Sequence, residues 1–166
     1  MNGKSKPYAI LVFGAPMSGK TTFAEQFSAR FNAPFLNLTE LQDEFKLTRQ
    51  LALLLIEKLA QCKQTIIIEG GLDNEKQRNE ITELFTQLGY RPVLVWIQTD
   101  LNAIKYRMRQ KYKKLEEAKA ILAEQYKKIE APSELEDPLV ISGKHTFQTQ
   151  CKNVLAGLSD RKHKID

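Results

Sequence analysis

Short apolar runs alternate with amphipathic segments along the chain. The first run, at residues 8–13, is continuous between Pro7 and Gly14, which predicts a strand buried on both faces of a sheet. Helical patterns are found at residues 21–31, 40–62, 75–88, 101–129 and 146–158, and further apolar runs at 34–38, 65–68, 93–97 and 139–141. Strands that alternate with helices form right-handed βαβ units. The pattern therefore predicts an α/β fold, with five parallel strands and helices on both faces of the sheet.

Composition places the 166 residues in the ordinary range of a globular protein, with 42% hydrophobic and 27% charged residues. The length fits one domain, and we expect residues 1–166 to form it. The apolar run near the N-terminus is too short for a signal segment or a membrane span, which predicts a cytoplasmic protein. The net charge of +5 suits a protein that handles phosphates, but it does not distinguish a nucleotide from a nucleic acid.

A glycine-rich motif lies between the first predicted strand and the first predicted helix. Residues 14–21, Gly-Ala-Pro-Met-Ser-Gly-Lys-Thr, match G-x-x-x-x-G-K-[ST] at every fixed position. In such a loop the backbone N–H groups surround an anion at the N-terminus of the helix. Lys20 is expected to reach the β- and γ-phosphates of ATP, and the Thr21 hydroxyl to bind Mg²⁺. The residues expected to bind the nucleotide here are Gly14, Ala15, Pro16, Met17, Ser18, Gly19, Lys20, Thr21 and Thr22.

Glu69 is a candidate second ligand for Mg²⁺ because it ends an apolar strand just before Gly70 and Gly71. Phosphoryl transfer depends on positioning and on charge neutralisation, so an acidic group beside the loop hydroxyl is expected. A glutamate at a strand end is otherwise a solvated residue or an ion-pair partner. The glycine-rich motif favours the metal role, with Thr21 and Glu69 as the metal residues.

These motifs resemble the P-loop kinases of the nucleoside-monophosphate-kinase-like group, in particular the small AAA-domain and polynucleotide-kinase-like ATP-binding proteins. The resemblance extends from Ile10 to about Gly143. It implies a sheet of order 2-3-1-4-5, with ATP and Mg²⁺ as cofactors. It also assigns Arg78 to the acceptor, Arg107 and Lys111 to the lid over ATP, and the loop with His145 to the adenine side.

The sequence departs from that group after the second strand. Relatives that phosphorylate a hydroxyl carry an aspartate there as the base, whereas Thr39 occupies the position in this chain. Thr39 and Gln42 fit a capping box, which predicts that a helix starts at Thr39. Glu40 and Asp43 lie beside it, and we expect them to contact the acceptor and to supply the missing base.

A basic segment at residues 105–114 falls within a helical lid predicted over about 101–130. Its cations fit either a solvated helix face or contacts to phosphates, including those of a polynucleotide. The main hypothesis is a kinase that transfers phosphate from ATP to a small-molecule or nucleotide acceptor, with Lys20, Glu69 and Arg107 in catalysis. The alternatives are an ATP-binding regulatory protein without efficient transfer, and a polynucleotide 5′-end kinase.

Overall fold

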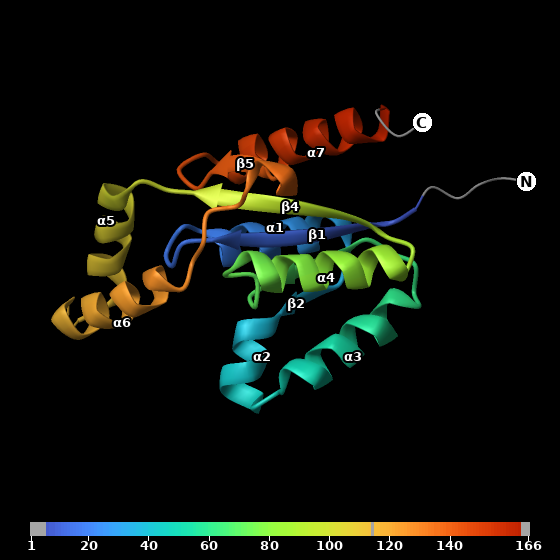
Figure 1. Ribbon diagram of the computed structural model, residues 1–166. Coiled ribbons are helices and arrows are strands. Elements are labelled where there is room, and N and C mark those ends of the chain that lie inside the picture. Colours follow the sequence, from blue (N-terminus) through green and yellow to red (C-terminus); the bar gives the residue numbers. More distant parts are fainter. Residues whose placement is uncertain (1–5, 114, 164–166) are drawn as a thin grey trace, which may run out of the picture.

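The computed structural model describes residues 6–113 and 115–163, which form a parallel sheet covered by helices (Figure 1). The strands are β1 (Tyr8–Gly14), β2 (Phe35–Asn37), β3 (Ile66–Glu69), β4 (Arg91–Gln98) and β5 (Leu139–Ser142). The helices are α1 (Lys20–Phe31), α2 (Leu38–Phe45), α3 (Arg49–Ala60), α4 (Glu75–Gln87), α5 (Leu101–Lys111), α6 (Leu115–Lys127) and α7 (Phe147–His163), with a short 3₁₀ turn η1 (Glu134–Glu136).

All strand pairs are parallel and the order is β2-β3-β1-β4-β5, which confirms the predicted sheet. The central strand β1 lies between β3 and β4. The chain adds β2 and β3 on one side of β1 and β4 and β5 on the other, so the turn after β1 lies at the point where the strand order reverses. Ligands of open α/β sheets bind at such a point, beyond the carboxyl ends of the strands. The register places Val12 of β1 opposite Glu69 of β3, which brings the end of β3 beside the glycine-rich loop.

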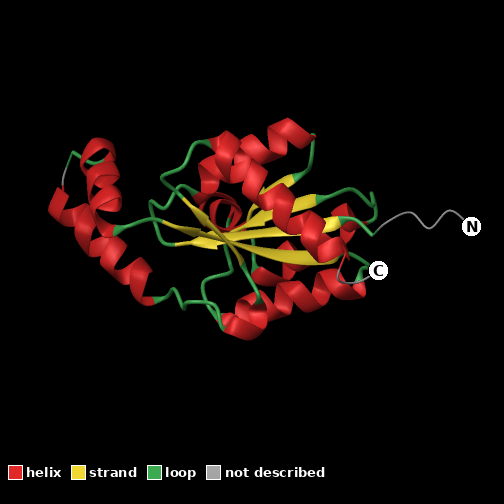
Figure 2. Ribbon diagram, turned by 90° about the horizontal axis from the view of Figure 1, so that it is seen from above, coloured by secondary structure: helices red, strands yellow, loops and turns green. Residues whose placement is uncertain are grey.

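Alternating residues of β1 supply two separate cores, because successive side chains of a strand point to opposite faces. Leu11 and Phe13 pack with α3 and α4, whereas Ile10 and Val12 pack with α1 and α7. Figure 2 shows the helices on both sides of the sheet. Helices α5 and α6 lie beyond the carboxyl ends of the strands, away from the main helical layers (Figure 1).

Two long helices predicted from the pattern are each divided in the structure. The segment predicted at residues 40–62 forms α2 and α3, because Lys46 adopts a left-handed backbone (φ 54°) and Thr48 caps a new helix by accepting the Leu51 N–H. The segment predicted at 101–129 forms α5 and α6. Apolar periodicity alone did not reveal either break, since both helices of each pair keep an apolar face.

No helix in the described part of the chain is long and apolar enough to cross a membrane.

Replacing Phe85 with alanine tests the core between the sheet and α4. Phe85 is fully buried and its ring contacts that of Tyr90, with centroids 5.3 Å apart. Phe85→Ala should lower the free energy of unfolding by about 3–5 kcal/mol, measured by urea denaturation. Phe45, which is 68% exposed, is the matched control. Phe45→Ala should change stability by no more than about 0.5 kcal/mol. Equal effects of the two substitutions would contradict this core.

Candidate functional site

The loop between β1 and α1 curls around the N-terminus of α1. Met17 and Gly19 both have positive φ, and the Ser18 N–H donates to the Ala15 carbonyl (3.1 Å). A Cβ at Gly14 would lie 2.4 Å from the Ile97 carbonyl oxygen, so this position accepts only glycine. Positive φ at the non-glycine Met17 is the kind of backbone strain found at ligand sites. The result is an anion cradle of backbone N–H groups at a helix N-terminus.

Thr21 and Glu69 meet at the base of this loop. The Thr21 hydroxyl donates to Glu69 Oε1 at 2.8 Å. Glu69 is 3% exposed, and its other oxygen, Oε2, is buried without a hydrogen-bond partner among the described residues. A buried carboxylate oxygen normally has a partner, and its absence here points to a ligand. The Thr21 hydroxyl and the Glu69 carboxylate both offer oxygen ligands, which Mg²⁺, a hard cation, prefers.

Burial and nearby carboxylates have opposite effects on the charge of Lys20. Burial lowers the pKa of Lys20, while the charges of Glu69 and Asp73 oppose that shift. Burial likewise raises the pKa of Glu69, against the Thr21 hydrogen bond and the Lys20 charge. The Lys20 ammonium donates only a long hydrogen bond (3.4 Å), to the Ala15 carbonyl. An anion at Lys20 and a cation at Glu69 would each stabilise the ionised form.

One pocket, here called the lid pocket, opens between the loop, the lid helices and the start of α7. Its volume is about 680 Å³, and it is lined by Thr22, Arg107, Lys111 and His145 together with Lys20, Thr21 and other residues. Pro16, Met17 and Gly19, also assigned to the nucleotide from the sequence, line it as well, whereas Gly14, Ala15 and Ser18 do not. Such a volume suits a small ligand.

Arg107 and Met17 fasten the lid to the loop. The guanidinium of Arg107 donates to the carbonyls of Met17 (2.9 Å) and Gly143 (2.5 Å). The Met17 side chain packs on a small apolar cluster of α5 and α6, formed by Met108, Ala118 and Leu122. Loop and lid are thus in direct contact. Lys114, the last cation of the predicted basic segment, lies outside the described residues.

Gly143 and Thr99 support the same loop from the other side, and sequence reasoning gave neither a role. The Thr99 hydroxyl donates to the Ser18 carbonyl (2.9 Å), and a Cβ at Gly143 would lie 2.0 Å from that oxygen. Gly143 therefore has to be glycine for the segment after β5 to approach the loop. A glycine two residues after the strand predicted at 139–141 was the only signal in the sequence.

A second pocket, here called the α2 pocket, lies on the opposite side of Lys20 and Thr21, which line both pockets. Its volume is about 600 Å³. It is lined by Glu40 and Asp43, which the sequence analysis assigned to the acceptor, and also by Asp73, which sequence reasoning missed. An acidic residue four positions after Glu69, in the loop that follows a strand, was the available signal. The charge of Asp73 acts on Lys20 and opposes the lowering of its pKa.

The start of α2 differs from the prediction. Asn37, not Thr39, is the N-cap, since its side chain accepts the Glu40 N–H at 3.1 Å. Asparagine is the stronger capping residue, and it already ends β2. Thr39 instead lies against Gly70, where an added Cβ would be 2.4 Å from its hydroxyl oxygen. The contact holds α2 against the end of β3.

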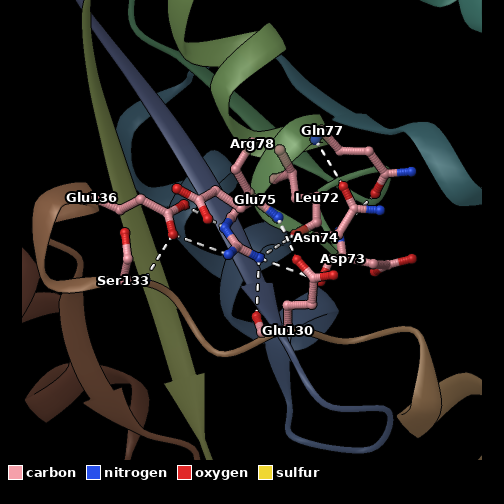
Figure 3. Close-up of polar contacts among 9 residues, drawn as sticks. All are labelled: Leu72, Asp73, Asn74, Glu75, Gln77, Arg78, Glu130, Ser133 and Glu136. Carbon is pink, nitrogen blue, oxygen red and sulfur yellow. Dashed lines mark hydrogen bonds and ion pairs between the residues drawn. The ribbon is translucent and has the colours of Figure 1, made fainter.

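Arg78 is engaged inside the protein rather than open to an acceptor. It is fully buried and forms a bidentate ion pair with Glu136, at 2.6 and 3.1 Å. Its remaining hydrogen bonds go to the backbone carbonyls of Leu72, Asp73 and Glu130 (Figure 3). The guanidinium also lies 4.9 Å from the centre of the Phe13 ring. This burial contradicts the expected acceptor contact, because every guanidinium nitrogen is already bonded within the protein.

The loop, the sheet order and the two pockets define a P-loop protein with the fold of the nucleoside-monophosphate-kinase-like group. The chain belongs to the family described as the AAA domain, whose model matches residues 10–134. No curated protein matches the chain.

Solved structures of kinases share this fold over nearly the whole chain. A gluconokinase from Sinorhizobium meliloti has a TM-score of 0.73 at 17% identity, covering 98% of this chain and 97% of its own. An APS kinase from Mycobacterium tuberculosis, in complex with AMPPNP and APS, has a TM-score of 0.67 at 14% identity, covering 94% and 99%. A shikimate kinase from Aquifex aeolicus has a TM-score of 0.52 at 20% identity, covering 93% and 98%. At these identities the likeness establishes the fold.

The buried Arg78–Glu136 pair yields a stability prediction. Glu136→Ala leaves the guanidinium buried and unpaired, so the free energy of unfolding should fall by about 3–5 kcal/mol. Glu124, exposed and paired with Lys127, is the control. Glu124→Ala should cost no more than about 1 kcal/mol in the same denaturation experiment.

The same pair predicts a pH dependence. Burial alone would raise the pKa of Glu136, but the bonds from Arg78 and from the Ser133 N–H hold it below the ordinary 4.5. Because the pKa is lower in the folded protein, this stabilisation is complete above pH 4.5 and is lost as the pH falls through the folded-state pKa. Glu136→Gln should reduce this acid-side loss. An unchanged pH profile in the variant would contradict the assignment.

Proposed function

We propose that this protein is a kinase that transfers the γ-phosphoryl group of ATP-Mg²⁺ to a hydroxyl of a small-molecule acceptor. The observation that carries the proposal is the position of Lys20 and Thr21, which line both the lid pocket and the α2 pocket. A nucleotide in the first pocket and an acceptor in the second would meet at these two residues. The kinases among the similar structures support the same reading. Cytoplasmic location remains a prediction from the sequence.

The nucleotide half of the site is supplied by the loop and the lid. Backbone N–H groups of residues 14–21 and the Lys20 ammonium bind the phosphates, while Arg107 and Lys111 face them from the lid. His145 also lines the lid pocket, and we assign it to the adenine side. Thr21 and Glu69 would hold Mg²⁺, which offsets negative charge on the phosphates when bound.

Asp73 is the best-placed base in the α2 pocket. The base has to lie close to the transferring phosphoryl group and therefore close to Lys20. Asp73 lines this pocket together with Lys20, and its charge opposes the lowering of the Lys20 pKa. Its backbone is fixed by three hydrogen bonds, involving Gln77, Arg78 and Glu130. We therefore assign to Asp73 the proton-accepting role that Thr39 cannot fill, with Glu40 and Asp43 in contact with the acceptor.

The transfer then balances as follows. The acceptor hydroxyl oxygen forms a bond to the γ-phosphorus, and the bond from that phosphorus to the β–γ bridging oxygen breaks. The leaving electron pair stays on ADP, and the hydroxyl proton goes to Asp73. Lys20 and Arg107 bind the charge that spreads over the phosphoryl oxygens.

The two alternatives make different demands on the α2 pocket. A regulatory ATP-binding protein needs no catalytic base. The absence of a carboxylate at Thr39 would favour that function only if Asp73 did not act as the base. A polynucleotide 5′-end kinase needs a cationic path for the strand, and the carboxylates lining this pocket disfavour a polyanion. Acceptor-dependent release of ADP from ATP-Mg²⁺, measured over a panel of metabolites, nucleotides and a single-stranded oligonucleotide, separates all three. ATP binding without ADP release by any acceptor would contradict the kinase.

Replacing Lys20 removes the charge shared by the two pockets. Lys20→Ala should reduce acceptor-dependent ADP release at least about a hundredfold, because a positioned cation no longer faces the transition-state charge. Lys76, exposed on α4 away from both pockets, is the control, and Lys76→Ala should retain full activity. Full activity of Lys20→Ala would remove the loop from the mechanism.

Replacing Asp73 tests the base. Asp73→Asn keeps the size of the side chain but cannot take up the proton, so kcat should fall by about 10²- to 10⁴-fold, with a much smaller change in the Kd of ATP. Glu40→Gln and Asp43→Asn, measured in parallel, should act mainly on the KM of the acceptor. A larger loss of kcat in either of these variants than in Asp73→Asn would transfer the role of base to α2.

A further inference from the structure

One face of α2 presents three carboxylates to the α2 pocket. Glu40, Asp43 and Glu44 all line it, and their spacing of i, i+3 and i+4 places them on the same side of the helix. The opposite wall comes from the end of α6 and the segment after it, with Gln125 and Lys128. The mouth of the pocket is thus strongly acidic on one side.

These carboxylates are not explained by the stability of α2. None of the three side chains forms an ion pair or hydrogen bond with another described residue, and like charges at this spacing destabilise a helix. Asp43 and Glu44 also lie toward the C-terminal end of α2, where the helix dipole favours cations and the last turn has none. Lys46 donates to the Asp43 carbonyl oxygen and does not line the pocket. An acidic face that costs stability and borders a pocket points to a ligand.

The arginines nearest to this pocket are engaged elsewhere. Arg78 is buried against Glu136, and Arg49 donates to Glu80 (2.6 Å) and to the Gly71 carbonyl (3.3 Å). Lys20 also lines the pocket, but in the proposed function it binds the phosphates of ATP. Of the described residues that line the pocket, Lys128 is then the one cation left to face an acceptor. The pocket therefore offers few cationic side chains to an anionic acceptor.

A second observation indicates that the pocket is built for a ligand. Glu69, the proposed Mg²⁺ ligand, also lines this pocket, is 3% exposed, and has a buried oxygen, Oε2, that no described residue contacts by a hydrogen bond. The pocket volume of about 600 Å³ suits a small molecule. Asn37 lies on the same wall as the acidic face and offers a polar group for an acceptor hydroxyl.

We propose that the acceptor is a small hydroxyl compound that carries a protonated amine, such as an amino sugar or an amino alcohol, and that Glu40, Asp43 and Glu44 bind its ammonium group. The proposal rests on the proposed function, since it names the acceptor class of that site. The ammonium would be held by charge-assisted hydrogen bonds from α2, which leaves a hydroxyl to be directed toward Lys20 and Asp73.

Binding is measured by calorimetry on the full chain in the presence of AMPPNP and Mg²⁺. The probes are glucosamine, glucose and gluconate, which share a carbon skeleton and differ in charge, and kanamycin as a larger amino sugar. The Kd of glucosamine should be at least about tenfold lower than that of glucose, with gluconate the weakest. Equal or tighter binding of gluconate, or no kanamycin binding up to about 10 mM, would overturn the proposal.

A matched pair of triple variants separates the site from general surface charge. Glu40→Gln/Asp43→Asn/Glu44→Gln should weaken kanamycin binding at least about tenfold. Glu57→Gln/Glu83→Gln/Asp160→Asn changes the net charge by the same amount on α3, α4 and α7, and it should bind kanamycin like the wild type. Equal binding by both variants would overturn the assignment of α2.

The same probes in the ADP-release assay distinguish the acceptor class from the phosphotransfer activity. If gluconate or glucose accepts phosphate best, the kinase stands and the acceptor class is wrong. If no probe raises ADP release while kanamycin binds through α2, the recognition stands and the phosphotransfer is wrong.

Discussion

The buried guanidinium of Arg78 is the constraint on which the site depends. It joins β1, through Phe13, to the segment after β3 and to the segment that returns from the lid, through Glu136. Figure 3 shows Glu136 and Asp73 on opposite sides of this guanidinium. A buried charge without a partner would be strongly unfavourable, so these segments are held in one arrangement. That arrangement fixes the backbone of Asp73 beside Lys20.

The charges of the site are divided between its two halves. The lid pocket is cationic, with Arg107 and Lys111, whereas the mouth of the α2 pocket is acidic. Lys20 lies between them and is partly balanced by carboxylates on the α2 side. Anionic phosphates are therefore favoured on one side and disfavoured on the other. In the proposed kinase, this polarity would orient the phosphate donor and give the acceptor pocket a different chemistry from the nucleotide pocket.

Most of the fold and the nucleotide half of the site could be predicted, because both depend on short segments. Apolar runs identified the five strands of the described residues, and the fixed positions of the loop identified Lys20 and Thr21. Glu69 was found because β3 ends there and lies next to β1 in a parallel sheet. The division of the two long helices was missed, since a single left-handed residue such as Lys46 leaves no mark on apolar periodicity.

The acceptor half depended on contacts between residues far apart in the chain, and there local signals were misleading. Thr39 has the sequence context of a cap, yet Asn37 takes that role, and Arg78 matches an acceptor-binding arginine, yet it is buried against Glu136. The sequence by itself determined the sheet, the phosphate loop and the acidic residue beside it, because chain-local patterns encode them. Only the tertiary structure decided which charges remain open to a ligand, because burial and pairing are set by segments that meet only in the fold.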